Sequence, residues 1–176
     1  MKNLPLAKVY QLLEPGPVVF LTTAAKGRAN VMVMSWHMPV EFEPPRIACV
    51  VSNRNFSYAA LTATEECVIA IPARGLAAKL VKVGNVSGRR LDKFKAFGLT
   101  PLPAARVAAP LVAECFANLE CRVIDTRFVP DYGLFVLEVV KAWIDPGQKN
   151  PKTIHHRGYG AFAVDGPIIR LKSSKK

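Results

Sequence analysis

The chain has 176 residues, of which 51% are hydrophobic and 21% charged, and its formal net charge is +11. This length suits a single domain over residues 1–176 with one sizeable core, and the composition excludes a disordered chain. No apolar run reaches the roughly eighteen residues that a membrane-spanning helix needs, and the N-terminus lacks a signal-peptide pattern. We therefore expect a cytoplasmic protein with no membrane partner.

The excess positive charge is compatible with nucleic acid, an anionic membrane surface or an anionic ligand. Part of it lies in the C-terminal RLKSSKK, and two internal concentrations occur in GRRLDKFK (88–95) and HHRG (155–158). Few aromatic residues are interleaved with these charges, as a stacking platform for bases would need. We therefore expect no nucleic-acid partner.

Metal ligands in a usable arrangement are absent from the sequence. The four cysteines form no Cys-x-x-Cys pair, and they are expected to be reduced and buried as small hydrophobic residues. His155 and His156 are adjacent, so on a strand they would point to opposite faces. No metal site is predicted.

The first half of the chain alternates between short strands and helices. Proline and glycine mark its boundaries: Pro15-Gly16-Pro17 ends a first helix, Gly27 allows a turn, and Pro39 is expected to stop the strand ladder before it. The expected helices cover 4–14 and 56–66, and the expected strands cover 18–23, 29–38, 47–52 and 67–72.

The middle of the chain, residues 75–98, has helical stretches interrupted at Gly84 and Gly88, and Gly98 is expected to end the second stretch. A proline-rich, extended connector follows. The segment CFANLECRVIDTRFV then alternates apolar and polar residues. This pattern predicts a half-buried antiparallel strand with Asn118, Glu120, Arg122 and Thr126 on its polar face.

The last elements are a returning strand and a hairpin. The turn PDYG (130–133) is followed by LFVLEVVKAWID, which is expected to run back against the preceding strand. A short hairpin is expected around Asp165-Gly166. About seven strands, few helices and no regular βαβ alternation predict a mostly β fold, closed as a small Greek-key barrel.

Common catalytic motifs are missing, but one segment suits an anionic ligand. There is no dinucleotide fingerprint, no phosphate-binding P-loop and no Gly-x-Ser-x-Gly elbow. SNRNFSYAAL (52–61) leaves a strand and begins a helix, whose free N–H groups attract anions, and it contains Arg54 and Ser57. The residues alone leave open an ordinary capped helix with a solvated arginine. A second basic group, Arg89-Arg90 with Lys93, could complete the same site.

The segments GRANVMVMSWHMPVEFEPPRIACVVSNRNFSYAAL, VKVGNVSGRRLDKFKAFGLTP and LFVLEVVKAWID resemble the flavin reductase-like family. The resemblance covers roughly residues 15–145 and, more loosely, the HHRGYGAF segment. It implies a split β-barrel that binds FMN in a homodimer, with the partner helping to enclose the cofactor. One departure is that many relatives have Thr or Ala where Val33 and Met34 stand, and bulkier side chains there would narrow the ring pocket.

The resemblance also implies a set of cofactor-binding residues. The segment along the flavin ring matches NVMVMSW, the segment at the phosphate and ribityl chain matches SNRNFS, and Lys93 is placed near the same phosphate. His155 or His156 is placed near the ring or the reductant, and we select His155. The predicted FMN-binding residues are Asn30, Met32, Val33, Met34, Ser35, Trp36, Ser52, Asn53, Arg54, Ser57, Lys93 and His155.

The first functional hypothesis is an FMN-dependent oxidoreductase that takes hydride from NADH or NADPH and passes electrons to free flavin, a ferric chelate or another acceptor. The alternative is a flavoredoxin-like electron carrier that binds FMN without using NAD(P)H. A third reading is a barrel without flavin that binds another anionic ligand, such as haem or pyridoxal phosphate, or binds nucleic acid through its net charge of +11. Because hydride transfer to the flavin needs no obligatory acid or base, no catalytic residue is predicted.

Overall fold

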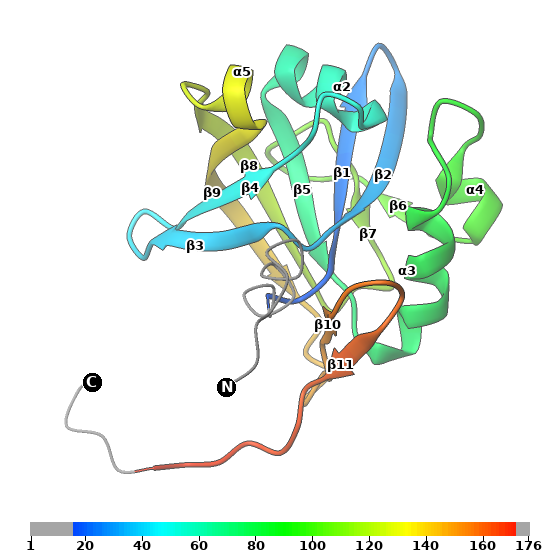
Figure 1. The fold of residues 1–176 in the computed structure, drawn as a ribbon, viewed down its shortest axis with the longest axis vertical. Coiled ribbons are helices and arrows are strands. Elements are labelled where there is room, and N and C mark those ends of the chain that lie inside the picture. The colour runs from blue at the N-terminus through cyan, green and yellow to red at the C-terminus, as the bar shows by residue number, and fades with distance from the viewer. Residues whose placement is uncertain (1–15, 172–176) are drawn as a thin grey trace, which may run out of the picture.

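Most of the chain folds into one strongly curved antiparallel sheet (Figure 1), as seen in a computed structural model that describes residues 16–171. The sheet has seven strands in the order β2-β1-β5-β8-β9-β4-β3. Their bounds are β1 Val19–Ala25, β2 Arg28–Met34, β3 His37–Glu41, β4 Arg46–Val50, β5 Glu66–Ile71, β8 Ala117–Asp125 and β9 Leu134–Ile144. The helix expected over residues 4–14 lies outside the described residues.

The sheet closes on itself because its two edge strands are consecutive in the chain. β2 ends at Met34 and β3 begins at His37, so only Ser35 and Trp36 separate the two edges. Three residues of extended chain span at most about 11 Å. The backbone N–H of Val50 in β4 also donates to the Trp36 carbonyl at 3.0 Å. The predicted split β-barrel is confirmed.

Short helices and two small strand pairs surround this sheet. They are α2 Phe56–Thr64, η2 Arg74–Leu76, α3 Ala77–Gly84, α4 Lys93–Phe97, α5 Val129–Tyr132, β6 Pro101–Leu102 with β7 Leu111–Val112, and β10 Ile154–His156 with β11 Phe162–Val164. The helices α3 and α4 end near the glycines that the sequence indicated, and Gly98 has the left-handed φ of 57° expected at a helix end.

The side chains of the sheet form two cores, one on each face. Inside the barrel, apolar residues of β1, β4, β5, β8 and β9, including Leu21 and Phe135, pack against Leu61 of α2 and Val129 of α5. On the outer face, residues such as Phe20 are covered by α3, α4 and the connector 99–115. Three of the four cysteines lie in the inner core and one in the outer core, so their predicted burial is confirmed.

Two expectations, one about where a strand ends and one about where a hairpin turns, were wrong. Pro39 does not stop the ladder but pairs with Ile47 within β3. This is possible because β3 is an edge strand, where a proline that lacks an N–H can face away from its neighbour. The final hairpin does not turn at Asp165-Gly166: β10 and β11 are joined by residues 157–161, where Gly158 and Gly160 have positive φ.

The solvent face predicted for β8 was confirmed at Arg122 and Thr126, which are exposed, but was wrong at Asn118 and Glu120, which are both buried. The connector covers this face of the sheet, and both side chains bind its backbone. Asn118 accepts from the N–H of Val112 at 2.8 Å and donates to its carbonyl at 3.2 Å. Glu120 accepts from the N–H of Ala105 at 3.0 Å and from the indole N–H of Trp143 at 2.6 Å. The N–H of Arg106 binds its other oxygen.

Replacing Glu120 with Gln should destabilise the protein by about 1.5–3 kcal/mol at pH 7, since hydrogen bonds to a buried carboxylate are lost. Burial alone would raise the pKa of Glu120, but the N–H groups of Ala105, Trp143 and Arg106 together lower it. The carboxylate therefore contributes stability above its unfolded pKa, and this contribution is lost as the pH falls through the lower folded pKa.

Urea unfolding at pH 7 and pH 3 measures this effect. The difference between wild type and Glu120→Gln should narrow at the lower pH. The matched control is Glu114→Gln, whose carboxylate binds the exposed Thr100. Equal losses in the two variants would show that Glu120 has no special structural role.

None of the helices within residues 16–171 is long and apolar enough to cross a membrane. Over the same residues, no group of three or more His, Cys, Asp or Glu side chains is placed to hold a metal ion.

Candidate functional site

A first cavity of about 270 Å³ lies where β2, the start of α2, the loop after α3 and the start of α4 meet. Arg54, Asn55, Ser57 and Lys93 in its lining belong to the segments in which the sequence suggested an anion site. No acidic residue lines it. The lining residues are Asn30, Met32, Val33, Arg54, Asn55, Phe56, Ser57, Gly84, Asn85, Val86, Ser87, Gly88 and Lys93.

The N-terminus of α2 opens into this cavity. Asn55 occupies the cap position, yet its side chain makes no capping hydrogen bond. The free N–H groups of a first helical turn, with the positive end of the helix dipole, favour an anionic ligand. Beneath them, the amide of Asn30 donates to the Ser57 hydroxyl at 2.8 Å and ties β2 to α2. Arg54 stands immediately before this helix and lines the same cavity.

Lys93 brings a buried cation to the opposite wall. Its side chain is only 5% exposed, and its Nζ donates to the carbonyl of Val83 at 2.9 Å. Burial lowers the pKa of Lys93 to about 8. Because a carbonyl cannot neutralise an ammonium group, a ligand with a negative charge would complete its environment.

An arginine–phenylalanine–arginine stack fixes the outer part of this cavity. The guanidinium carbons of Arg28 and Arg89 lie 5.1 and 6.0 Å from the ring centroid of Phe56. Arg28 also donates to the carbonyl of Gly88. A Cβ at Gly88 would lie 1.9 Å from the Asn30 side-chain oxygen, so only glycine permits this close approach. The loop after α3 is thereby held against β2.

A second cavity of about 280 Å³ adjoins the first and shares Val33, Gly84 and Asn85 with it. Its walls are mainly apolar, and it too has no acidic lining residue. Known ligand pockets are roughly 300–1,000 Å³, a range that the two cavities reach only in combination. The second cavity is lined by Val18, Val33, Met34, Ser35, Leu80, Val81, Gly84, Asn85, His156, Gly160 and Phe162.

The strand β2 forms the floor that the two cavities share. It pairs with β1 along one side, and no strand among residues 16–171 pairs with its other side. Backbone N–H and C=O groups along such an edge are available to a ligand. Met32 and Val33, which project to opposite faces of the strand, both line the first cavity. The cavities therefore run along the strand edge.

The chain breaks its regular strand geometry at the end of this floor. β2 stops at Met34, and the Ser35 carbonyl accepts from the N–H of His37 at 3.1 Å. Ser35 can line the second cavity together with both Val33 and Met34 because the strand ends there. Trp36 was predicted from the family resemblance to lie along the flavin ring. It lines neither cavity and is 52% exposed.

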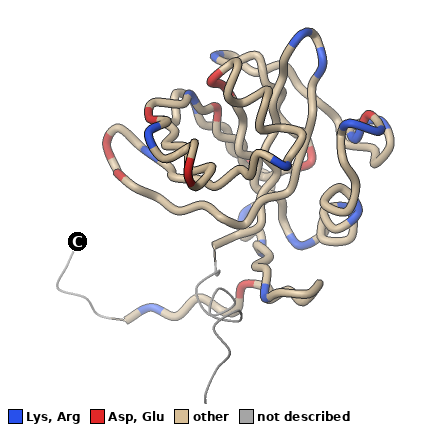
Figure 2. The backbone as a smooth tube through the Cα atoms, turned by 45° about the horizontal axis from the view of Figure 1, so that its top comes forward, with Lys and Arg blue, Asp and Glu red and all other residues tan. Residues whose placement is uncertain are grey.

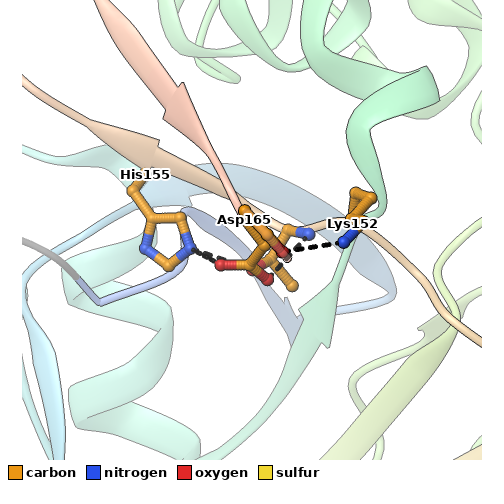
Figure 3. A network of polar contacts seen from close by, with 5 residues as sticks. Lys152, His155 and Asp165 are labelled. Carbon is orange, nitrogen blue, oxygen red and sulfur yellow. Dashed lines mark hydrogen bonds and ion pairs between the residues drawn. The ribbon is translucent and has the colours of Figure 1, made fainter. Parts of the chain in front are cut away.

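The hairpin of β10 and β11 forms the far wall of the second cavity, and a polar cluster fastens its base (Figure 3). His155 lies 2.8 Å from a carboxylate oxygen of Asp165 and 2.9 Å from the Thr153 hydroxyl, which also donates to Asp165. Lys152 donates to the Gly166 carbonyl at 2.9 Å. His156 lines the cavity and lies 5.4 Å from the ring of Phe162. The two histidines thus have different places, and His155, the one selected from the sequence, is outside the cavity.

The two cavities bring together eight of the predicted site residues. The first contains Asn30, Met32, Val33, Arg54, Ser57 and Lys93, and the second contains Val33, Met34 and Ser35. Ser52 and Asn53 instead line a separate cavity of about 170 Å³ beside α5. The Ser52 hydroxyl accepts from the N–H of Arg54, which shapes the turn before α2.

Sequence reasoning missed the loop 84–88 and the hairpin residue Phe162 as parts of the site. The two glycines of GNVSG were identified only as helix breaks. Their spacing was the available indication, because two glycines near a basic segment are typical of a loop that approaches a ligand closely. Phe162 had no such indication, since its position depends on the hairpin register.

Comparisons with known proteins agree with this fold. Residues 12–163 match the model of the flavin reductase like domain. YddH of Escherichia coli (strain K12) is 34% identical over 173 residues, which cover 90% of this chain and 92% of that protein.

Two solved structures have the same fold. Flavoredoxin of Desulfovibrio vulgaris (Miyazaki F) superposes with a TM-score of 0.87 at 24% identity, covering 99% of both chains. An FMN-binding domain of a flavin reductases-like enzyme from Shewanella baltica OS155 superposes with a TM-score of 0.82 at 26% identity, covering 97% of both chains. The chain therefore belongs to the flavin reductase-like domain family.

Proposed function

We propose that the chain binds FMN across the two adjoining cavities and acts as an FMN-dependent oxidoreductase. The observation that carries this proposal is the polarity of the combined site. One end has a helix N-terminus, Arg54 and the buried Lys93, and the other end has apolar walls. FMN has the same polarity, with a phosphate dianion at one end and a flat, largely apolar ring at the other.

The residues present fit this cofactor. Arg54, Ser57 and the first N–H groups of α2 would hold the phosphate, with Lys93 supplying a second cation. The free edge of β2 would supply backbone groups to the polar rim of the ring, and Val33, Leu80 and Phe162 would enclose its apolar part. The Shewanella baltica protein named above is described as an FMN-binding domain, in agreement with this assignment.

When bound, FMN supplies the hydride and electron chemistry, and NADH or NADPH would be the reductant. The protein's own residues would bind and orient. The hairpin holds His156 and Phe162 at the ring end, where they limit access of water and direct the approach of a reductant. No residue is assigned as a general acid or base.

The absorption spectrum of the purified protein tests the proposal. The protein should be yellow or should take up added FMN stoichiometrically, and NADH or NADPH should bleach it under anaerobic conditions. A protein that takes up no FMN would refute the proposal. Uptake of FMN without reduction by either nicotinamide would instead make the chain an electron carrier.

We further propose that two copies associate through β3. Trp36, Met38, Val40 and Phe42 lie on or beside this edge strand, whose register shifts around Val40, and all are exposed, Phe42 by 96%. A row of exposed apolar side chains on an unpaired strand edge favours association with another chain. A second copy would cover this row and could bring its own residues to the nearby end of the ring site.

Replacing Met38 with Glu should convert the dimer to a monomer, because a charge would be buried at the proposed interface. Met38 is 58% exposed in the protomer, so the change should not unfold it. Light scattering after size exclusion measures the mass. Tyr132→Glu, at a residue of α5 that is 69% exposed, is the control and should leave the mass unchanged. A Met38→Glu protein that remains dimeric would place the interface elsewhere.

A further inference from the structure

The positive charge of this protein is concentrated in one segment. Residues 67–113 contain eight Lys or Arg residues and one acidic residue, Asp92. The rest of the described chain, residues 16–66 and 114–171, contains eleven basic and eleven acidic residues. The positive excess of the described chain therefore lies in this segment, and six of its eight basic residues belong to α3, α4 and the loop between them.

The middle of this segment, from α3 to the start of α4, borders the proposed flavin site. α3 and the loop after it line both cavities, and α4 supplies Lys93. Lys82 follows Val81, which lines the ring-end cavity, and Arg90 follows Arg89 at the phosphate end; both are exposed. Figure 2 shows Lys and Arg residues on the α3–α4 side and also elsewhere on the barrel, while most Asp and Glu residues lie on the side away from α3 and α4.

The charge exceeds what a cofactor phosphate requires. A phosphate monoester has at most two negative charges, and Arg54 and Lys93 suffice to hold them. Lys82, Arg90 and Lys95 are exposed and line neither cavity. A strongly positive surface of this kind around a site attracts anions from solution and increases their association rates by about 10- to 1,000-fold.

We propose that the physiological electron acceptor is an anion that is drawn to the ring-end cavity by the α3–α4 surface, defined by Lys82, Arg90 and Lys95. This inference rests on the proposed flavin function and specifies its acceptor. A negatively charged metal chelate or an acidic redox protein has the required chemistry. A neutral or cationic acceptor gains nothing from this surface.

Oxidation of the reduced FMN protein by two metal complexes of opposite charge tests the proposal. Two ferricyanide ions each take one electron from one two-electron-reduced flavin, whose protons go to solvent, and two hexaammineruthenium(III) ions do the same. In anaerobic stopped-flow experiments, the ferricyanide rate should fall at least tenfold between low and high salt as the surface is screened. The ruthenium rate should rise or stay constant. Equal salt dependence for both oxidants would overturn the proposal.

Charge-reversal variants show which basic residues cause the salt dependence of the ferricyanide rate. Lys82→Glu and Arg90→Glu should each lower the ferricyanide rate at low salt by about tenfold, with little change at high salt. Arg127→Glu changes the net charge equally near α5 and should change the rate by less than about twofold. A loss in Arg127→Glu as large as in Lys82→Glu would show that only net charge matters.

An experiment on the cofactor-free protein separates this inference from the flavin proposal. Hexacyanochromate(III) is a paramagnetic anion of the same charge as ferricyanide. With inorganic phosphate present to occupy the site of Arg54 and Lys93, it should broaden the amide signals of residues 79–82 and 95 more than those of α5, and Lys82→Glu should reduce this broadening. Uniform broadening would overturn the inference even if FMN binds. The oxidation rates of the reduced FMN protein by ferric citrate and by an acidic cytochrome c distinguish a metal chelate from a redox protein. The acceptor that reacts faster identifies the class of acceptor.

Discussion

Replacing Arg54 with Ala should weaken FMN binding by roughly 10- to 150-fold and leave riboflavin binding almost unchanged. A hydrogen bond to a charged group contributes about 1.5–3 kcal/mol, and riboflavin lacks the phosphate that Arg54 would bind. Arg54 stands at the start of α2 in the cavity that also contains Lys93. Fluorescence titration of the cofactor-free protein with each flavin gives the two dissociation constants.

The control for this prediction is Arg74→Ala, which removes an exposed arginine that lines neither cavity. It should change neither affinity by more than about twofold. Arg54→Lys should give an intermediate loss for FMN, because lysine keeps the charge but not the bidentate geometry. If Arg54→Ala weakens FMN and riboflavin equally, Arg54 shapes the loop before α2 and does not hold the phosphate.

Three of the strands, β1, β4 and β5, were predictable because each is short and apolar. β1, β4 and β5 lie within a residue or two of the expected ranges, since a buried strand needs a continuous apolar run. The helix from Phe56 and the helix end at Gly98 were predictable for the same local reason. These features depend on neighbours in the sequence.

Features that depend on distant parts of the chain were not predictable. Glu120 occupies a position that looks solvent-facing, and only the connector packed over β8 makes it buried. The expected strand 29–38 is divided at Ser35 because the sheet must close there. His155 and His156 could not be distinguished, because their roles depend on Asp165, which comes to the base of the hairpin through its register.

The candidate site also contains residues that the local sequence located and one residue that only the resemblance assigned. Arg54, Ser57 and Lys93 were located from the types of residue around a helix start and a basic segment. The structure brings them to one cavity, as the sequence suggested. Trp36 was assigned to the ring from the resemblance alone. In the protomer it is part of the exposed apolar row on β3, so a contact with the ring would require the partner of the proposed dimer.

The affinity for FMN should decrease above pH 8 by up to tenfold for each pH unit, because Lys93 binds the phosphate only when protonated. Burial lowers the pKa of Lys93 to about 8 in the free protein, and a bound dianion would raise it. Binding above pH 8 therefore requires uptake of a proton. Titrations between pH 6.5 and 10 should show this decrease for FMN and none for riboflavin. Lys93→Met should bind FMN weakly at every pH.

The substitution Lys93→Met should also make the cofactor-free protein more stable, by about 1–3 kcal/mol at pH 7. The folded pKa of Lys93 is below its unfolded value of about 10.5, so folding favours the neutral form. The cost of keeping the charge is fully present below pH 8 and disappears as the pH approaches 10.5.

Urea unfolding should therefore show Lys93→Met more stable than wild type at pH 7 and nearly equal at pH 10. Lys95→Met, an exposed neighbour in α4, should change stability by less than about 0.5 kcal/mol at either pH. A Lys93→Met protein that is less stable than wild type at pH 7 would show that Lys93 holds α3 and α4 together through Val83 and is not kept at a cost to stability for a ligand.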